Sequence, residues 1–260
     1  MAIEVIEPGF LSILQDRGRF GHHRLGLTTG GPLDLNAYRI CNKLLSNPED
    51  AAVIEVTLGG LIITATSDHL ICVTGAPVEL KINNTPVSNW SCHTLIEGDS
   101  LSLNAGEKGL RSYLGVANGF EINLDFGSVS TVTRENIGGL NGDKLSAGDV
   151  LNCKSIDDRP KLKLEGEQLP VFEDQASLRV IPGYQYENFS KVDINRFFST
   201  PYKVTDRSDR MGYRLLGPPV AIQEKQLLSE GICLGAIQIP ADGQPIILLN
   251  DRQTIGGYPK

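Results

Sequence analysis

The chain has 260 residues, of which 24 are basic and 31 are acidic, so its formal net charge is −7. The basic residues are scattered, whereas binding of nucleic acid needs a clustered positive face, and we therefore expect no nucleic-acid partner. No stretch reaches the roughly 18 apolar residues of a membrane span, and the N-terminus lacks the basic region and apolar run of a signal peptide.

The cysteine and histidine patterns indicate neither disulfides nor a metal. The five cysteines are widely spaced and form no CxxC pair, which is typical of free thiols in a reducing cytoplasm. Only His22 and His23 are adjacent, and neighbours in sequence rarely bind one ion. We expect a cytoplasmic protein with no membrane association and no metal. Cys233 stands among apolar residues and is expected in the core rather than as a nucleophile.

Strands dominate the predicted elements. Short runs rich in β-branched and aromatic residues alternate with the turn formers Gly, Pro, Asn and Asp. These runs lie at 53–66, 69–83, 99–105, 111–118, 177–183, 202–207 and 238–249. Helical periodicity is confined to 32–45 and 192–198, with a third and very short candidate at 50–54.

Many short strands with frequent turn signals predict a mainly β fold of the barrel or sandwich type. The segment 152–176 is charged, contains two prolines and shows little apolar periodicity, so it is interpreted as a linker region. We therefore expect an N-terminal domain at 1–155, a linker at 156–175 and a C-terminal domain at 176–260. Both halves are β-rich, which favours a pair of related barrels, although there is no strict internal repeat.

The stretch 12–45 is unusually rich in glycine and arginine. Dense glycines let a backbone approach a ligand closely, and arginines among them supply planar donor forks suited to carboxylate or phosphate. Neither a Walker A loop nor a GxGxxG turn is present. The alternative is a glycine-rich hairpin with solvated charges, and the sequence leaves both interpretations open.

Two further polar clusters lie at 205–215 and 237–260, the second flanking the apolar run 245–249. Loops at the ends of a buried strand are where binding groups gather on a rigid scaffold. Candidates to clamp a carboxylate or phosphate are Arg19, Arg207, Arg210 and Arg214. Candidates to orient these arginines or to act as a catalytic base are Asp16, Asp209 and Asp251. An internal ion-pair network is an equal alternative, above all for Asp209.

Glutamines form the other class of candidate. Gln238, Gln244 and Gln253 flank the apolar run, and an amide offers both a donor and an acceptor to a lactam or ureido group. We place Gln238 and Gln244 with the catalytic candidates, and Gln253 and Tyr258 with the substrate-binding ones. The alternative is that these amides cap strand ends and loops.

The sequence resembles the family known as allophanate hydrolase subunit 2, KipA or the 5-oxoprolinase C subunit, which is biotin-dependent-carboxyltransferase-like. The runs that carry the resemblance are EPGFLSILQDRGRFGHHRLGLTTGGPLD, AAVIEVTLGG, GLRSYLGVANGF, GSVSTVTRENIGG, LRVIPGYQY, SDRMGYRLLG and SEGICLGAIQIPADGQPIILLNDRQTIGGYPK. It implies two cyclophilin-like β-barrel domains packed around a groove that holds the ligand. It also implies a partner of the subunit 1 type, namely KipI or the 5-oxoprolinase B subunit.

The sequence departs from the family pattern at two places. The family usually carries arginine in a Gly-Ser-Arg-Ser-Thr run, where this chain has Val129. The family pattern also usually continues beyond the position of Lys260, so we expect the C-terminal barrel to be incomplete relative to the family.

The resemblance implies two chemistries and one regulatory role. The first is hydrolysis of 5-oxo-L-proline to L-glutamate with ATP, together with the B subunit, and with an A subunit of the LamB/YcsF type. The second is transfer of CO₂ from carboxybiotin to urea, and the third is KipA-type binding of a KipI-like kinase inhibitor. A chain without a fused subunit 1 or biotin domain favours the 5-oxoprolinase role. Because no known phosphate-binding loop is present, we expect activity only in the complex.

Overall fold

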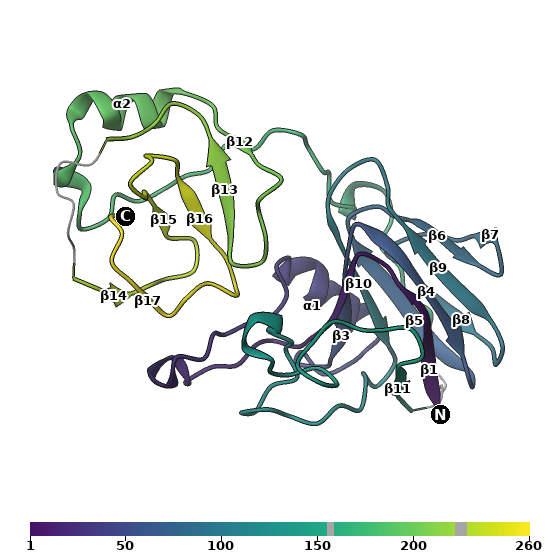
Figure 1. The fold of residues 1–260 in the computed structure, drawn as a ribbon. Helices are drawn as coiled ribbons and strands as arrows, with labels where there is room; N and C mark the ends of the chain where they lie inside the picture. The colour runs from purple at the N-terminus through teal and green to yellow at the C-terminus, as the bar shows by residue number, and fades with distance from the viewer. Residues whose placement is uncertain (155–158, 222–227) are drawn as a thin grey trace. The chain divides into compact units, whose positions relative to one another are not determined.

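Antiparallel strands are the main regular element of the computed structural model, which describes residues 1–154, 159–221 and 228–260 (Figure 1). Two α-helices occur in these ranges, α1 (Leu35–Leu44) and α2 (Lys191–Ser199). The chain divides into two compact units. Unit 1 consists of Met1–Arg19 and Gly30–Ala176, and unit 2 consists of Phe20–Thr29 and Ser177–Lys260. The described part of 156–175, expected to be a linker, is therefore counted with unit 1.

Unit 1 is built on two antiparallel sheets. The six-stranded sheet has the order β11-β1-β4-β9-β6-β7 and the five-stranded sheet has the order β2-β3-β10-β5-β8. The strands of the first are β1 (Ala2–Pro8), β4 (Gly59–Ala65), β6 (Glu79–Ile82), β7 (Thr85–Pro86), β9 (Ser100–Asn104) and β11 (Val150–Asn152). Those of the second are β2 (Leu11–Gln15), β3 (Val53–Thr57), β5 (His69–Gly75), β8 (Cys92–Leu95) and β10 (Arg111–Val116).

The five-stranded sheet is buried on both faces, which explains why β5 is a continuous apolar run rather than an alternating one. Ile71 and Val73 contribute to a core cluster that also contains side chains of the six-stranded sheet. Leu70 and Cys72 contribute to a second cluster, which contains the apolar side of α1. Two layers of sheet and one helix thus enclose the core of unit 1.

Helix α1 lies within 32–45, where the sequence predicts a helix, and begins three residues later than expected. Asp34 is its N-cap, and a side-chain oxygen of Asp34 accepts a hydrogen bond from the backbone N–H of Ala37 at 2.9 Å. At the other end, the guanidinium of Arg159 donates to the carbonyl oxygen of Leu45 at 2.8 Å. A cation at a helix C-terminus satisfies free carbonyls and opposes the helix dipole.

Unit 2 contains a four-stranded sheet, ordered β12-β13-β16-β15, and a two-stranded one, β14-β17. The strands are β12 (Lys203–Val204), β13 (Gly212–Leu216), β14 (Glu230–Gly231), β15 (Ile237–Gln238), β16 (Ile246–Leu248) and β17 (Ile255–Gly256). Among its described hydrophobic residues only Val220, Ile232, Ile239 and Leu248 are buried. The apolar core of unit 2 is therefore much smaller than that of unit 1.

Three sequence expectations fail at the level of elements. The short helix expected at 50–54 does not form, because β3 begins at Val53 and its residues are buried in the sheet. The strand expected at 177–183 is irregular chain. Cys233, expected in the core, is exposed, whereas the other four cysteines are buried.

Candidate functional site

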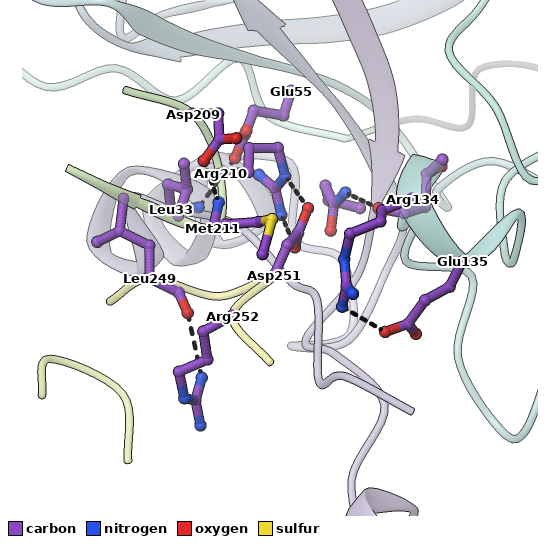
Figure 2. A network of polar contacts seen from close by, with 12 residues as sticks. Leu33, Glu55, Arg134, Glu135, Asp209, Arg210, Met211, Leu249, Asp251 and Arg252 are labelled. Carbon is purple, nitrogen blue, oxygen red and sulfur yellow. Dashed lines mark hydrogen bonds and ion pairs between the residues drawn. The ribbon is translucent and has the colours of Figure 1, made fainter. Parts of the chain in front are cut away.

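The central contact of unit 2 is a buried ion pair between two predicted site residues (Figure 2). Arg210 Nε donates to Asp251 Oδ2 at 2.8 Å, and Arg210 Nη2 donates to Asp251 Oδ1 at 3.0 Å. Both residues are less than one-tenth exposed, at 7% and 5%. A parallel two-bond pair of this kind fixes both side chains in orientation as well as position. It joins the loop before β13 to the loop after β16.

Arg252 follows this pair in the chain and faces the backbone. Its Nε donates to the carbonyl oxygen of Ile232 at 3.1 Å, and its Nη1 donates to that of Leu249 at 3.2 Å (Figure 2). Burial lowers the pKa of Arg252 from its usual value, with the neighbouring Cys233 thiol acting in the opposite sense. Arg252 belongs to the polar cluster at 237–260 that the sequence indicated, but no role was predicted for it, unlike its neighbours Asp251 and Gln253.

Two of the predicted catalytic residues use their side chains on backbone groups. Asp209 Oδ1 accepts from the N–H groups of Met211 and Gly212, at 2.8 and 3.2 Å, which is the geometry of an Asx turn. Both ends of the Gln244 amide bind one residue, because Oε1 accepts from Gly217 N at 3.0 Å and Nε2 donates to Gly217 O at 3.1 Å. These contacts support the structural alternatives for Asp209 and Gln244.

Gln238 has a different environment. It is 3% exposed, and its Nε2 is buried without a hydrogen-bond partner in the part of the chain that the structure describes. A Cβ added to Gly256 would lie 3.1 Å from Gln238 Nε2 and 2.8 Å from Gln253 Nε2, so both amide nitrogens border the same glycine. The structure therefore brings together two of the three glutamines that the sequence selected.

The remaining candidates of unit 2 are at its surface. Arg207 and Arg214 are exposed, and Tyr258 is half exposed. The backbone N–H of Arg214 is bonded to Ser208 Oγ at 3.0 Å, and its strand β13 holds the residue in register with Ile246. Exposed guanidinium groups can still reach an anionic ligand.

In unit 1, Asp16 is the centre of a buried hydrogen-bond network. Its Oδ1 accepts from Gly18 N, Ser128 Oγ and Ser130 Oγ at 2.9, 2.6 and 2.7 Å, and its Oδ2 accepts from Val129 N at 2.8 Å. The carboxylate thus has a donor for most of its lone pairs. This arrangement gives Asp16 the role of fixing the 128–130 segment.

Arg19 is fully buried and binds the same region. Its Nε donates to Asp125 O at 2.9 Å and its Nη2 donates to Ser130 O at 3.0 Å. Val129, which departs from the arginine that the resemblance led us to expect, is 4% exposed and packs in the core cluster between the sheets. The 128–130 segment therefore presents a core side chain at Val129, and Arg19 supplies a guanidinium to the same segment.

A buried acid in unit 1 escaped the sequence reasoning. Glu55 is 0% exposed within β3, and its Oε2 accepts from Leu33 N and from Tyr113 Oη, both at 2.9 Å (Figure 2). Arg111 Nε lies 3.7 Å from Glu55 Oε1. Burial, together with the Glu55 charge, raises the pKa of Tyr113. The signal was available, because a glutamate interrupts the apolar run VIEVT.

A cavity of about 620 Å³ lies within unit 2, and none of the predicted site residues lines it. Its wall is mainly apolar and includes Phe189, Phe197 and Ile239. Glu230 lines it too, accepting hydrogen bonds from Lys260 Nζ and from Gln185 Nε2, and these bonds lower the pKa of Glu230.

Neither a metal cluster nor a membrane-spanning helix occurs in the described residues. Within those ranges, no group of three or more His, Cys, Asp or Glu residues could hold a metal ion. Neither α1 nor α2 is long and apolar enough to cross a membrane.

Comparison with known proteins places the chain in a family. Residues 25–260 match the family described as carboxyltransferase domain, subdomain A and B. The chain belongs to this carboxyltransferase domain family. It is 35% identical over 260 residues to the C subunit of 5-oxoprolinase from Escherichia coli, a match that covers 99% of this chain and 83% of that protein.

Longer proteins also match the chain over part of their length. The chain is 30% identical to urea amidolyase of Saccharomyces cerevisiae, covering 99% of this chain but 15% of that protein. The crystal structure of TTHA0988 superposes with a TM-score of 0.88 at 33% identity, covering all of this chain and 50% of that one. The family resemblance and the mainly β fold expected from the sequence are thereby confirmed.

Proposed function

We propose that this chain is the C subunit of an ATP-dependent 5-oxoprolinase, which hydrolyses 5-oxo-L-proline to L-glutamate. The main support for the proposal is the share of each protein that its match to this chain covers. The match to the C subunit of the Escherichia coli enzyme extends over 99% of this chain and 83% of that protein, whereas only 15% of the yeast urea amidolyase is matched. A relative that is matched over most of its own length supports a similar role better than one that is matched over 15% of its length does.

The proposed complex contains a subunit 1-type partner, which is the 5-oxoprolinase B subunit, together with a LamB/YcsF-like A subunit. The relative is named as the C subunit of 5-oxoprolinase, and this name supports the existence of other subunits. ATP would be consumed by the assembled complex. In unit 2 the exposed guanidinium groups of Arg207 and Arg214 have the charge and accessibility to contact a phosphate or the substrate carboxylate.

Within unit 2 we assign different parts to the predicted residues. Gln238 and Gln253 would contact the reacting ring, because their amides border one glycine and Gln238 Nε2 has no other described partner. Arg210 and Asp251 would position the neighbouring loops through their ion pair. Hydrolysis of a lactam adds water across the C–N bond and gives a carboxylate and an amine. Donors held towards the carbonyl oxygen stabilise the charge that develops there.

We place the complex in the cytoplasm. The support is that all five cysteines are free thiols, which is the usual state in a reducing compartment.

The test is reconstitution. The chain is co-expressed with the genes for the two proposed partners, and 5-oxoproline-dependent ATP hydrolysis is measured for the complex and for every omission of one component. We expect turnover only from the full set. Robust turnover by the purified chain alone would contradict the need for partners, and no turnover by any combination would contradict the proposed reaction.

A second candidate is transfer of CO₂ from carboxybiotin to urea. It is favoured by the description of the family as a carboxyltransferase domain and by the 30% identity to yeast urea amidolyase. Biotin would then be carried by another chain or domain. Urea-dependent carboxylation in the reconstituted assay, without hydrolysis of 5-oxoproline, would select this candidate. The KipA-type regulatory role stays a prediction from the resemblance.

A further inference from the structure

The cavity of about 620 Å³ in unit 2 has no part in the proposed function. Its lining comes from α2, from β14 and β15, and from the chain between 179 and 189 (Figure 1). Phe189, Phe197 and Ile239 supply apolar wall, and Phe198, which also lines the cavity, is 56% exposed. A volume of this size lies within the range of small-molecule sites, about 300–1,000 Å³. The cavity therefore suits a small molecule with a large apolar part.

An anion and a cation lie side by side in this lining. Lys260 Nζ donates to Glu230 Oε1 at 2.5 Å, and Gln185 Nε2 donates to the same oxygen at 2.9 Å. These bonds lower the pKa of Glu230, which keeps it a carboxylate at neutral pH. Arg179 is the one other charged residue of the described lining, and it is exposed. The cavity thus combines an apolar wall with one adjacent pair of opposite charges.

The pair retains hydrogen-bonding capacity that a ligand can use. The two bonds engage Oε1 of the Glu230 carboxylate and one of the three N–H groups of the Lys260 ammonium. Oε2 of Glu230 can therefore accept from a ligand cation, and Lys260 can donate to a ligand anion. The Glu230 side chain is 40% exposed, so the pair is accessible to a molecule that enters the cavity. Hydrogen bonds to ionised groups are about twice as strong as neutral ones, and two of them would fix the charged end of a ligand.

The charges and the wall together indicate the class of ligand. We propose that this cavity binds an α-amino acid with a large apolar side chain, its ammonium group at Glu230 and its carboxylate at Lys260. A charged side chain is disfavoured, because burying a charge against an apolar wall without a partner costs free energy. L-Glutamate, the product of the proposed reaction, is therefore not the ligand. The inference stands independently of the proposed function.

The test is calorimetric titration of the purified full chain with L-phenylalanine. Three comparison compounds each lack one required feature. The first, 3-phenylpropionate, lacks the ammonium group, 2-phenylethylamine lacks the carboxylate, and L-alanine lacks the large apolar side chain. L-Glutamate is the fourth, because it places a charge where the wall is apolar. We expect L-phenylalanine to bind at least about tenfold more tightly than each of these four compounds.

Two charge variants separate the two ends of the ligand. Glu230→Gln should weaken L-phenylalanine binding about tenfold, while 3-phenylpropionate, which has no ammonium group, binds as before. Lys260→Met should weaken L-phenylalanine binding to a similar extent, while 2-phenylethylamine, which has no carboxylate, binds no more weakly. Glu187→Gln and Lys203→Met are the matched controls, because both residues are exposed and neither lines the cavity. These controls should bind L-phenylalanine as the unmodified chain does.

A wall variant tests the apolar part. Phe198→Ala should weaken L-phenylalanine binding several-fold, whereas Val192→Ala, at an exposed residue of the same helix that does not line the cavity, should not. The proposal is overturned if L-phenylalanine does not bind, if 3-phenylpropionate binds as tightly as L-phenylalanine, or if Glu230→Gln and Lys260→Met bind L-phenylalanine normally. Equal binding by Phe198→Ala and Val192→Ala would place the ligand elsewhere and would overturn it too. Because no partner subunit is needed, these outcomes are read separately from the reconstitution of 5-oxoproline turnover.

Discussion

Arg210 and Asp251 are joined three times inside unit 2. Two side-chain hydrogen bonds of 2.8 and 3.0 Å form the ion pair, and the backbone N–H of Asp251 donates to the carbonyl oxygen of Arg210 at 3.0 Å. Because the two residues are 41 positions apart in the chain, this contact closes a large loop of the unit. The pair therefore contributes to stability as well as to the positions of the residues that follow Asp251.

We expect Asp251→Ala to lower the free energy of unfolding by about 3–5 kcal/mol, because it leaves a buried guanidinium without its carboxylate. Arg210→Lys should cost less, since it keeps the charge and loses the planar two-bond geometry. Denaturant unfolding of the purified chain measures both. Asp206→Asn, at an exposed aspartate, is the control. A cost below about 1 kcal/mol for Asp251→Ala would show that the pair adds little.

Asp16→Asn should destabilise unit 1 although it is nearly isosteric. An amide replaces one carboxylate oxygen with a donor, so at least one of the four groups that now donate to Asp16 loses its acceptor. We expect a loss of about 1–3 kcal/mol, measured by thermal unfolding, and faster hydrogen exchange at Val129. Asp174→Asn, at an exposed position, should change neither quantity. Unchanged exchange at Val129 would contradict the anchoring role of Asp16.

Two glutamines of unit 2 should respond to the same substitution in opposite ways. Gln244→Met removes both bonds to Gly217 and should cost about 1–3 kcal/mol of stability, with turnover per folded complex retained. Gln238→Met removes a buried donor without a described partner, so stability should be unchanged or higher, while turnover falls. Unfolding curves and steady-state kinetics on the same preparations separate the two. If both variants lose stability equally, Gln238 is a structural residue.

The buried thiol of Cys153 predicts a pH dependence. Burial raises the pKa of Cys153 from 9.0 to about 11, so the folded state holds this proton more tightly than the unfolded state does. Its contribution is fully present below pH 9 and is lost as the pH rises to about 11, a change of about 3 kcal/mol. Cys153→Ala should flatten the loss of stability in this range. Cys233→Ala, at an exposed thiol, is the control for the substitution itself.

The β-rich character of the chain and about half of its described strands were predictable because they depend on local pattern. The runs 53–66 and 69–83 contain β3 to β6, and the helical segment expected at 32–45 contains α1. The helix expected at 50–54 was wrong because burial in the sheet outweighed a weak local preference.

The site was predictable as a set of residues but not as a set of contacts. Asp16 and Arg210 were selected as polar residues in glycine-containing loops, yet their partners lie 114 and 41 residues away, beyond the reach of any local pattern. Burial could not be predicted from the sequence either. An arginine among glycines suggests exposure, whereas Arg19 is fully buried. Gln244 bonds to the backbone of Gly217, whereas Gln238 Nε2 has no partner in the described part of the chain. The sequence does not show this difference.

The composition of unit 2 from two separate stretches, Phe20–Thr29 and Ser177–Lys260, has a consequence for synthesis on the ribosome. The first stretch emerges early, but the chain it packs with is translated last. While unit 1 folds, the 20–29 stretch lacks the part of unit 2 that it contacts in the finished protein. A nascent chain halted just after Ala176 should therefore carry a folded unit 1 with a protease-sensitive site near its N-terminus. That sensitivity should decrease only after the final strands have been made.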